Sequence, residues 1–154
     1  MDMSTIIETV GEWEGALVVR PLPGDRTPEI AWGDTFFYYE PGHVMPVNRQ
    51  PFATIVTKDY PDDDRSKLHR EGHYRVNIHP GKGSFSTWTA DNRSSPDSTD
   101  TIFAHPVYGD AGWLAVVNPG SKTSDAVRAL LREAFELDRD RYERRHLPTK
   151  EGND

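Results

Sequence analysis

The spacing of hydrophobic residues predicts an amphipathic helix near each end of the chain. Apolar side chains from Ile6 to Trp13 recur every three or four residues, which places them on one face of a helix over residues 5–13. Thr5 and Glu8 fit a capping box at the start of this helix. A longer helix is predicted from a Thr123 cap to about residue 145, because its apolar residues form one stripe: Val127, Leu130, Leu131, Ala134 and Phe135.

Short apolar or alternating segments between these helices predict strands at residues 16–20, 35–40, 51–57, 73–79 and 112–118. In the fourth segment, Tyr74, Val76 and Ile78 point to one side of the sheet, and Arg75 and Asn77 point to the other. Residues 83–88 fit either a short helix or a strand, and residues 89–100 form a polar loop.

The order of these elements predicts the fold class. The connections are too short for parallel crossovers, so the sheet is predicted to be mainly antiparallel. The class is therefore α+β, a single two-layer domain over residues 1–145 with the N- and C-terminal helices on one face of the sheet. Residues 146–154 are predicted to form a disordered tail.

Length and composition limit the classes of protein that fit. The 154 residues suit one domain, and the formal net charge of -7 opposes binding to nucleic acid or to anionic membranes. The absence of cysteine excludes disulfides, thiolate metal sites and cysteine nucleophiles. Because the N-terminus is acidic and no apolar run approaches the roughly 18 residues of a membrane span, we expect a cytoplasmic protein. Composition does not separate a monomer from a homodimer.

The segment "HPVYGDAGWLAVVNPG", residues 105–120, holds the first candidate catalytic groups. The following proline extends the backbone of His105, and Gly109 and Gly112 permit a tight turn into the strand. His105 and Tyr108 then remain as groups able to move a proton or to orient a substrate. A structural hydrogen bond from His105 that pins the loop also explains the segment, and both interpretations stay open.

The spacing of the other histidines does not predict a metal site. His73 and His79 point the same way but lie about 20 Å apart along an extended strand, whereas ligands of one ion lie about 2 Å from it. The acidic run at residues 62–64 fits a solvated turn, because no phosphate-binding glycine loop accompanies it. We therefore expect neither a metal nor another cofactor.

A second candidate site lies on the polar side of the strand at residues 73–79. Arg75 and Asn77 point away from the core there, and Lys58 ends the neighbouring strand. If these strands pair, the three side chains line one polar surface, with Tyr38 or Tyr39 and Trp88 as apolar walls of a small-molecule pocket. An exposed sheet face with ordinary cross-strand pairs is the alternative interpretation.

Several segments resemble known proteins: "EIAWGDTFFYY", "PFATIVTKDYPDDDRSKLHREGHYRVNI", "HPVYGDAGWLAVVNPG" and the helix that follows. Together they resemble a bacterial family of unknown function over nearly the whole chain. The helix–sheet–helix order, the segment "FATIVTKD" and the closing pattern of tryptophan, valine and leucine are similar to the MmcQ/YjbR-type double-wing fold. That similarity implies binding to DNA, which the acidic composition opposes.

Two functional hypotheses follow from these residues. In the first, the domain binds a small polar or anionic organic molecule, with Arg75 or Lys58 holding a carboxylate or phosphate and His105 moving a proton. Whether such a domain is an enzyme is left open. In the second, it is a non-catalytic module that binds protein or nucleic acid through the sheet face. The first hypothesis requires Arg75 and His105 to share a face of the sheet.

Overall fold

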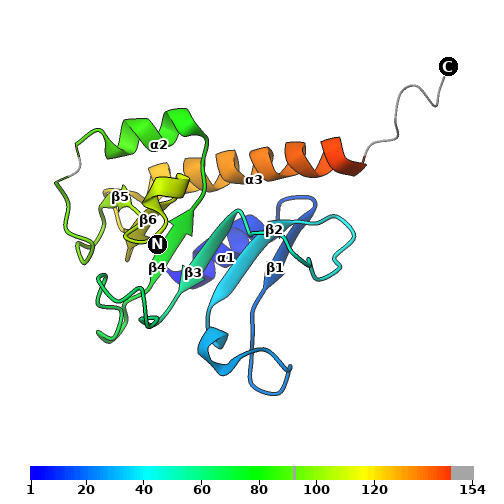
Figure 1. Ribbon diagram of the computed structural model, residues 1–154, viewed down its shortest axis with the longest axis horizontal. Helices are drawn as coiled ribbons and strands as arrows, with labels where there is room; N and C mark the ends of the chain where they lie inside the picture. The colour runs from blue at the N-terminus through cyan, green and yellow to red at the C-terminus, as the bar shows by residue number, and fades with distance from the viewer. Residues whose placement is uncertain (92, 147–154) are drawn as a thin grey trace.

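The computed structural model describes residues 1–91 and 93–146 of the chain. The strands are β1 (Ala16–Val19), β2 (Thr35–Tyr39), β3 (Ala53–Val56), β4 (Arg75–Ile78), β5 (Ile102–Ala104) and β6 (Leu114–Val117). They form one sheet in the order β1–β2–β3–β4–β6–β5, and every neighbouring pair is antiparallel (Figure 1). The helices are α1 (Met3–Gly11), α2 (Lys82–Thr89) and α3 (Ser124–His146), and η1 (Glu29–Ala31) and η2 (Gly109–Ala111) are short 3₁₀ turns. The predicted α+β class and antiparallel sheet are confirmed.

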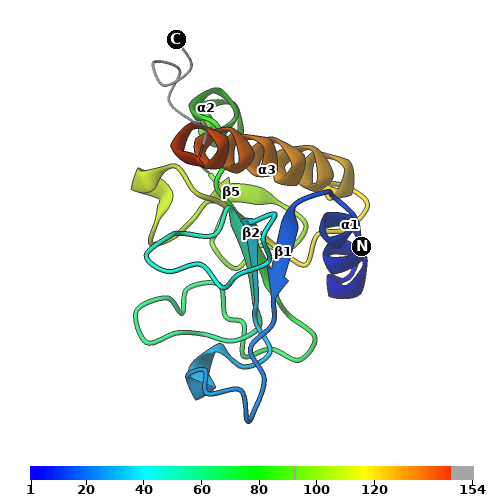
Figure 2. The same ribbon diagram turned by 90° about the vertical axis from the view of Figure 1, so that its right-hand side faces the viewer.

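Helices α1 and α3 lie on the same face of the sheet, as the sequence predicts (Figures 1 and 2). The apolar stripe of α3 is buried against strand residues of one parity, including Ile55, Val76 and Val116. Phe135 lies at the centre of this core, with its ring 5.2 Å from that of Trp13, 5.6 Å from Tyr39 and 5.8 Å from Phe52. This layer buries most of the large apolar side chains of the domain.

The first helix begins earlier than predicted. The Asp2 carboxylate accepts a hydrogen bond from the Thr5 backbone N–H at 2.9 Å, so Asp2 is the capping residue and Thr5 lies inside the helix. Trp13 lies beyond the end of α1, where it packs on Phe135. The predicted capping box at Thr5 is therefore wrong, because the Asp2 carboxylate accepts the Thr5 backbone N–H that the Glu8 side chain would accept in a capping box.

The second face of the sheet is covered by the connection between β3 and β4, residues 57–74, which we call the covering loop. Leu68 of this loop packs against Val56, Phe103, Ala115 and Val117 in a second, smaller apolar cluster. The sequence predicts an open polar face here, and that prediction is wrong: Arg75 and Asn77 point to this face but are buried. The covering loop therefore turns a candidate binding surface into an interior.

Helix α2 and strand β5 complete the fold. The ambiguous segment at residues 83–88 is helical, and β5 is a three-residue edge strand that the sequence pattern does not reveal. Part of the predicted disordered tail, residues 147–154, lies outside the described residues, whereas His146 is the last residue of α3. Within residues 1–91 and 93–146, no helix has the length and apolar composition that crossing a membrane requires.

Candidate functional site

Arg75 is the centre of a buried hydrogen-bond network beneath the covering loop. Its side chain is 1% exposed, and Nη1 donates to Asp63 Oδ1 at 2.9 Å and to Ser66 Oγ at 3.0 Å. Nη2 donates to the other Asp63 oxygen, and Nε donates to Asn77 Oδ1 at 2.7 Å. Asp63 thus occupies the bidentate edge of the guanidinium, which is the position predicted for a ligand carboxylate. The predicted role of Arg75 in holding a ligand does not fit these contacts.

His105 extends this network from the residue after β5. Its Nε2 lies 3.0 Å from Arg75 Nη2, so Arg75 and His105 share a face of the sheet, as the first hypothesis requires. Its Nδ1 accepts the backbone N–H groups of Val107 and Tyr108, each at 3.0 Å. Because Nδ1 accepts, the proton of the neutral ring is on Nε2, which lies 3.0 Å from Arg75 Nη2 and 3.7 Å from Asp63 Oδ2. Protonation of Nδ1 would remove the acceptor of both backbone N–H groups, so these two contacts favour the neutral ring.

The same surroundings set the ionisation of the network. Burial and the charge of Arg75 lower the pKa of His105 to about 4, although the Asp63 carboxylate partly offsets them. Burial alone would raise the pKa of Asp63, but the hydrogen bonds and charge of Arg75 outweigh burial and the net pKa is lowered. A neutral imidazole and an ionised carboxylate are the resting forms at neutral pH.

Acidification is expected to destabilise the fold as the pH falls from about 6.5 to about 4. Unfolded His105 has a pKa of 6.5 and folded His105 one of about 4, so the unfolded state binds more protons in this interval. Over the whole interval, this difference in pKa changes the free energy of unfolding by about 3 kcal/mol. Urea unfolding at pH 7 and at pH 4.5 measures most of this change. His105→Asn should lose much of this pH dependence, because an amide oxygen accepts the same two N–H groups without titrating. An unchanged pH dependence in that variant would contradict the assignment.

Lys58 belongs to a different polar cluster, around the buried Asp34. The Asp34 carboxylate accepts hydrogen bonds from Lys58 Nζ at 2.9 Å, from the Thr57 backbone N–H at 2.8 Å and from the Thr57 hydroxyl at 2.9 Å. The Tyr60 hydroxyl donates to the same carboxylate. The charge of Lys58 is therefore balanced within the protein, at the start of the covering loop.

The predicted apolar walls do not flank Arg75. Tyr39 lies on the face covered by α3, with its ring 5.6 Å from that of Phe135 and 5.3 Å from that of Tyr142. Trp88 lies on α2 and is 40% exposed. Tyr108 is 53% exposed, and its ring lies 5.0 Å from that of His105. The structure thus joins Arg75, Asn77 and His105 but separates Tyr39 from them, because strand register assigns Tyr39 to the opposite face.

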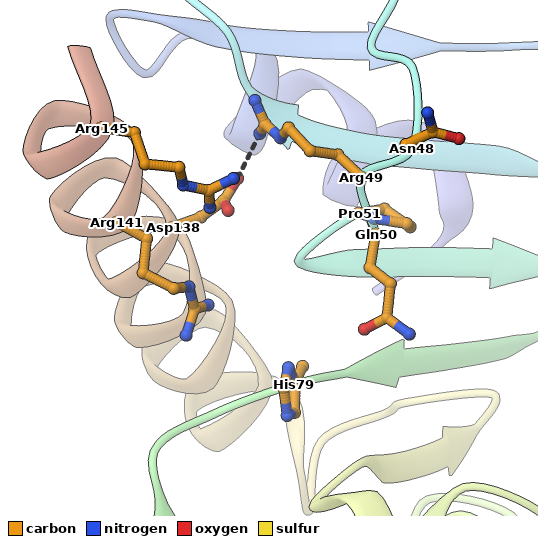
Figure 3. A pocket seen from close by; sticks show the side chains of 8 residues that line it. All are labelled: Asn48, Arg49, Gln50, Pro51, His79, Asp138, Arg141 and Arg145. Carbon is orange, nitrogen blue, oxygen red and sulfur yellow. Dashed lines mark hydrogen bonds and ion pairs between the residues drawn. The ribbon is translucent and has the colours of Figure 1, made fainter.

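A different set of side chains lines an open cavity of about 310 Å³ beyond the end of β4 (Figure 3). We call it the arginine pocket. It is formed by the end of α3, the segment before β3 and the residue after β4, with these lining residues: Asn48, Arg49, Gln50, Pro51, His79, Asp138, Arg141 and Arg145. A volume of this size is at the small end of the range for ligand sites in proteins.

One side of the arginine pocket is a fixed ion pair. Arg49 Nη2 donates to the Asp138 carboxylate at 3.0 Å and to the Tyr39 carbonyl oxygen at 2.8 Å. The same Asp138 oxygen accepts the Tyr39 backbone N–H at 2.8 Å. Asp138 is therefore neutralised by Arg49, and the two side chains join α3 to the end of β2.

The other arginines of the pocket have no such partner. Arg141 and Arg145 lie four residues apart on one side of α3 and extend toward the cavity (Figure 3). No hydrogen bond or ion pair joins either side chain to another residue in the described part of the chain. Three guanidinium groups thus border the cavity against one carboxylate, in a protein whose overall charge is negative.

His79 supplies a neutral group at the far end of the pocket. Its Nε2 donates to the Ala111 carbonyl oxygen at 3.0 Å, which leaves Nδ1 as an acceptor. Burial lowers the pKa of His79, the hydrogen bond to Ala111 opposes this, and the charge of Arg141 lowers the pKa further. At neutral pH the positive charge of the pocket therefore comes from the arginines.

Sequence reasoning did not find the arginine pocket. The spacing of His79 argues against a metal site, and the pattern of the last helix predicts only its apolar stripe. The available signal is the spacing of Arg141 and Arg145, which places two like charges four residues apart on one side of the helix. Nothing in the pattern indicates that this face lies against the segment before β3.

Residues 1–147 match a family of unknown function (DUF6194). No curated protein and no solved structure matches the chain. The predicted membership of an uncharacterised family is thus confirmed at that level, and the similarity to the MmcQ/YjbR-type fold stays a prediction.

Proposed function

This chain belongs to the DUF6194 family of unknown function, and we propose that it binds a small anionic molecule in the arginine pocket. The observation that carries the proposal is the pair Arg141 and Arg145, whose side chains face the cavity without a carboxylate partner among the residues described. Like charges held close together repel each other, and a bound anion removes that repulsion.

The chemistry of the pocket favours a phosphate or carboxylate group. A guanidinium presents N–H donors in a planar fork that matches the oxygens of either group. Gln50 adds an amide with two further donors, and His79 Nδ1 offers an acceptor for a hydroxyl group of the ligand. Arg49 is held in place by Asp138, so one donor group is already oriented before the ligand arrives.

A purely structural role for the arginines predicts a different result. Arg141 and Arg145 lie near the C-terminal end of α3, where positive side chains interact favourably with the helix dipole. Arg144 lies in the same region of α3 but is exposed and does not line the pocket. It is therefore a matched control for charge and for position on the helix.

Arg141→Gln and Arg145→Gln are each expected to weaken anion binding about tenfold or more, because a hydrogen bond to a charged group contributes about 1.5–3 kcal/mol. Calorimetric titration with inorganic phosphate and pyrophosphate at low ionic strength measures the dissociation constants. Arg144→Gln should change them less than twofold. Equal losses in all three variants, or no binding of either anion at millimolar concentration, would contradict the proposal.

Acid–base catalysis by His105 is not part of this proposal. Its Nδ1 accepts two backbone N–H groups and its Nε2 lies 3.0 Å from Arg75 Nη2, so both ring nitrogens already have partners within the protein. A structural role for His105, which was one of the two interpretations of the sequence, accounts for both contacts.

A further inference from the structure

Two further cavities lie next to the arginine pocket, along α2. A second cavity of about 340 Å³ shares His79 with the arginine pocket and lies between α2 and η2. A third cavity, of about 460 Å³, shares Phe85 and Asp110 with the second. The arginine pocket and the second cavity therefore lie on either side of His79, close enough for one ligand to contact both.

The middle cavity, which we call the slot, differs in chemistry from the arginine pocket. Its walls include Pro80, Phe85 and Ala111, and the His79 ring stacks on Trp113 with centroids 5.0 Å apart and planes 8° from parallel. Gly112 has a φ of 92°, and a Cβ atom at this position would lie 3.5 Å from His79 Nε2. The left-handed backbone there favours glycine, so η2 ends close against the His79 ring. The slot thus offers apolar and aromatic surface to a ligand.

The slot and the arginine pocket are held in a fixed relation by Glu133 of α3. Its Oε2 accepts the Gly81 backbone N–H at 2.6 Å, and its Oε1 accepts the Ser84 hydroxyl at 2.6 Å. These bonds attach the first turn of α2 to α3, the helix that also carries Arg141 and Arg145. A rigid arrangement of this kind lowers the conformational entropy lost when a ligand spans both cavities.

We propose that the ligand of the arginine pocket is an amphiphilic organic anion, with a phosphate or carboxylate group at the arginines and an apolar, planar body in the slot. This inference rests on the proposed function and adds the chemical class of the ligand. The charge of Arg141 and Arg145 selects the anionic group. Phe85 and the ring of His79, which is stacked on the buried Trp113, select the apolar body.

Two matched pairs of probes test the inference: inorganic phosphate with phenyl phosphate, and acetate with phenylacetate. In at least one pair the aryl compound is expected to bind about tenfold tighter, because partial burial of a phenyl ring in the slot adds to the contact of the anionic group. Ser86 is exposed and lines the slot, so Ser86→Trp should fill it. This variant should remove the advantage of the aryl compound and leave the inorganic phosphate dissociation constant within twofold of wild type.

Thr87→Trp is the control, because Thr87 is the next residue of α2, is exposed and does not line the slot. It should preserve the advantage of the aryl compound. If phosphate binds in an Arg141-dependent way but phenyl phosphate and phenylacetate bind no tighter than their small counterparts, the inference is wrong and the proposed function stands. If Ser86→Trp and Thr87→Trp have equal effects, the slot is not where the aryl group binds. If no probe binds, both proposals fail.

Discussion

Replacing Arg75 with methionine is expected to lower the free energy of unfolding by about 3–5 kcal/mol. Methionine retains much of the side-chain volume but leaves the Asp63 carboxylate beneath the covering loop without its bidentate partner. It also removes the donor that Asn77 accepts from. Urea unfolding at neutral pH, followed by far-ultraviolet circular dichroism, measures the change.

Two further variants separate the buried charge from the lost packing. Asp63→Leu combined with Arg75→Met removes both charges, so it should lose less stability than the sum of the single variants. Arg128→Met also breaks an ion pair, but the side chains of Arg128 and its partner Asp125 are both exposed to solvent. It should therefore cost about 1 kcal/mol or less. If Arg75→Met also lowered the free energy of unfolding by only about 1 kcal/mol, the Asp63 carboxylate would have to be hydrated in that variant.

Phe135→Ala is expected to lower the free energy of unfolding by about 3–5 kcal/mol. The phenyl ring is 1% exposed and contacts the rings of Trp13, Tyr39 and Phe52, which come from three other segments of the chain. Its removal leaves a cavity between α3 and the sheet that these rings cannot fill without moving the backbone. The midpoint and slope of urea unfolding measure the change.

A second substitution of Phe135 and a substitution of the next residue are the controls. Phe135→Leu should cost less than half as much as Phe135→Ala, because leucine fills most of the cavity. Glu136→Ala changes the next residue, whose carboxylate forms an exposed pair with Arg132, and should stay within about 0.5 kcal/mol of wild type. A small effect of Phe135→Ala would show that α3 contributes little to the core.

The helices and most strands can be predicted from the sequence because each repeats a periodic pattern of apolar residues. The stripe of α3 repeats over several turns, and every residue assigned to it is buried. The alternation around Arg75 predicts the two faces of β4 correctly, since Val76 and Ile78 lie in the main core while Arg75 and Asn77 lie beneath the covering loop. Strand β5 has only three residues, too few for an alternating pattern to stand out, so the sequence does not predict it.

The two polar sites depend on contacts that no periodicity describes. Asp63 belongs to an acidic run typical of a solvated turn, yet it reaches a strand residue twelve positions later and is partly buried there. The covering loop is mostly polar, and only scattered residues such as Ser66 and Leu68 show that it folds inward. The arginine pocket likewise joins Arg49, His79 and Arg141 from three separate segments. Their meeting follows from the packing of α3 across the sheet and not from local sequence.

The position of β6 between β4 and β5 has a consequence for the order in which the chain folds. Strands β5 and β6 are close in sequence and form a hairpin, whereas the pairing of Val76 with Val116 closes a long loop that contains α2. Loop-closure entropy makes the second step slower than the first. We therefore expect the hairpin to form as a local unit and then to dock on β4. Arg75 lies on β4 and His105 lies in the hairpin loop, so we expect their contact to form only when the hairpin docks. Substitutions of His105 should therefore slow folding only if docking is the rate-limiting step.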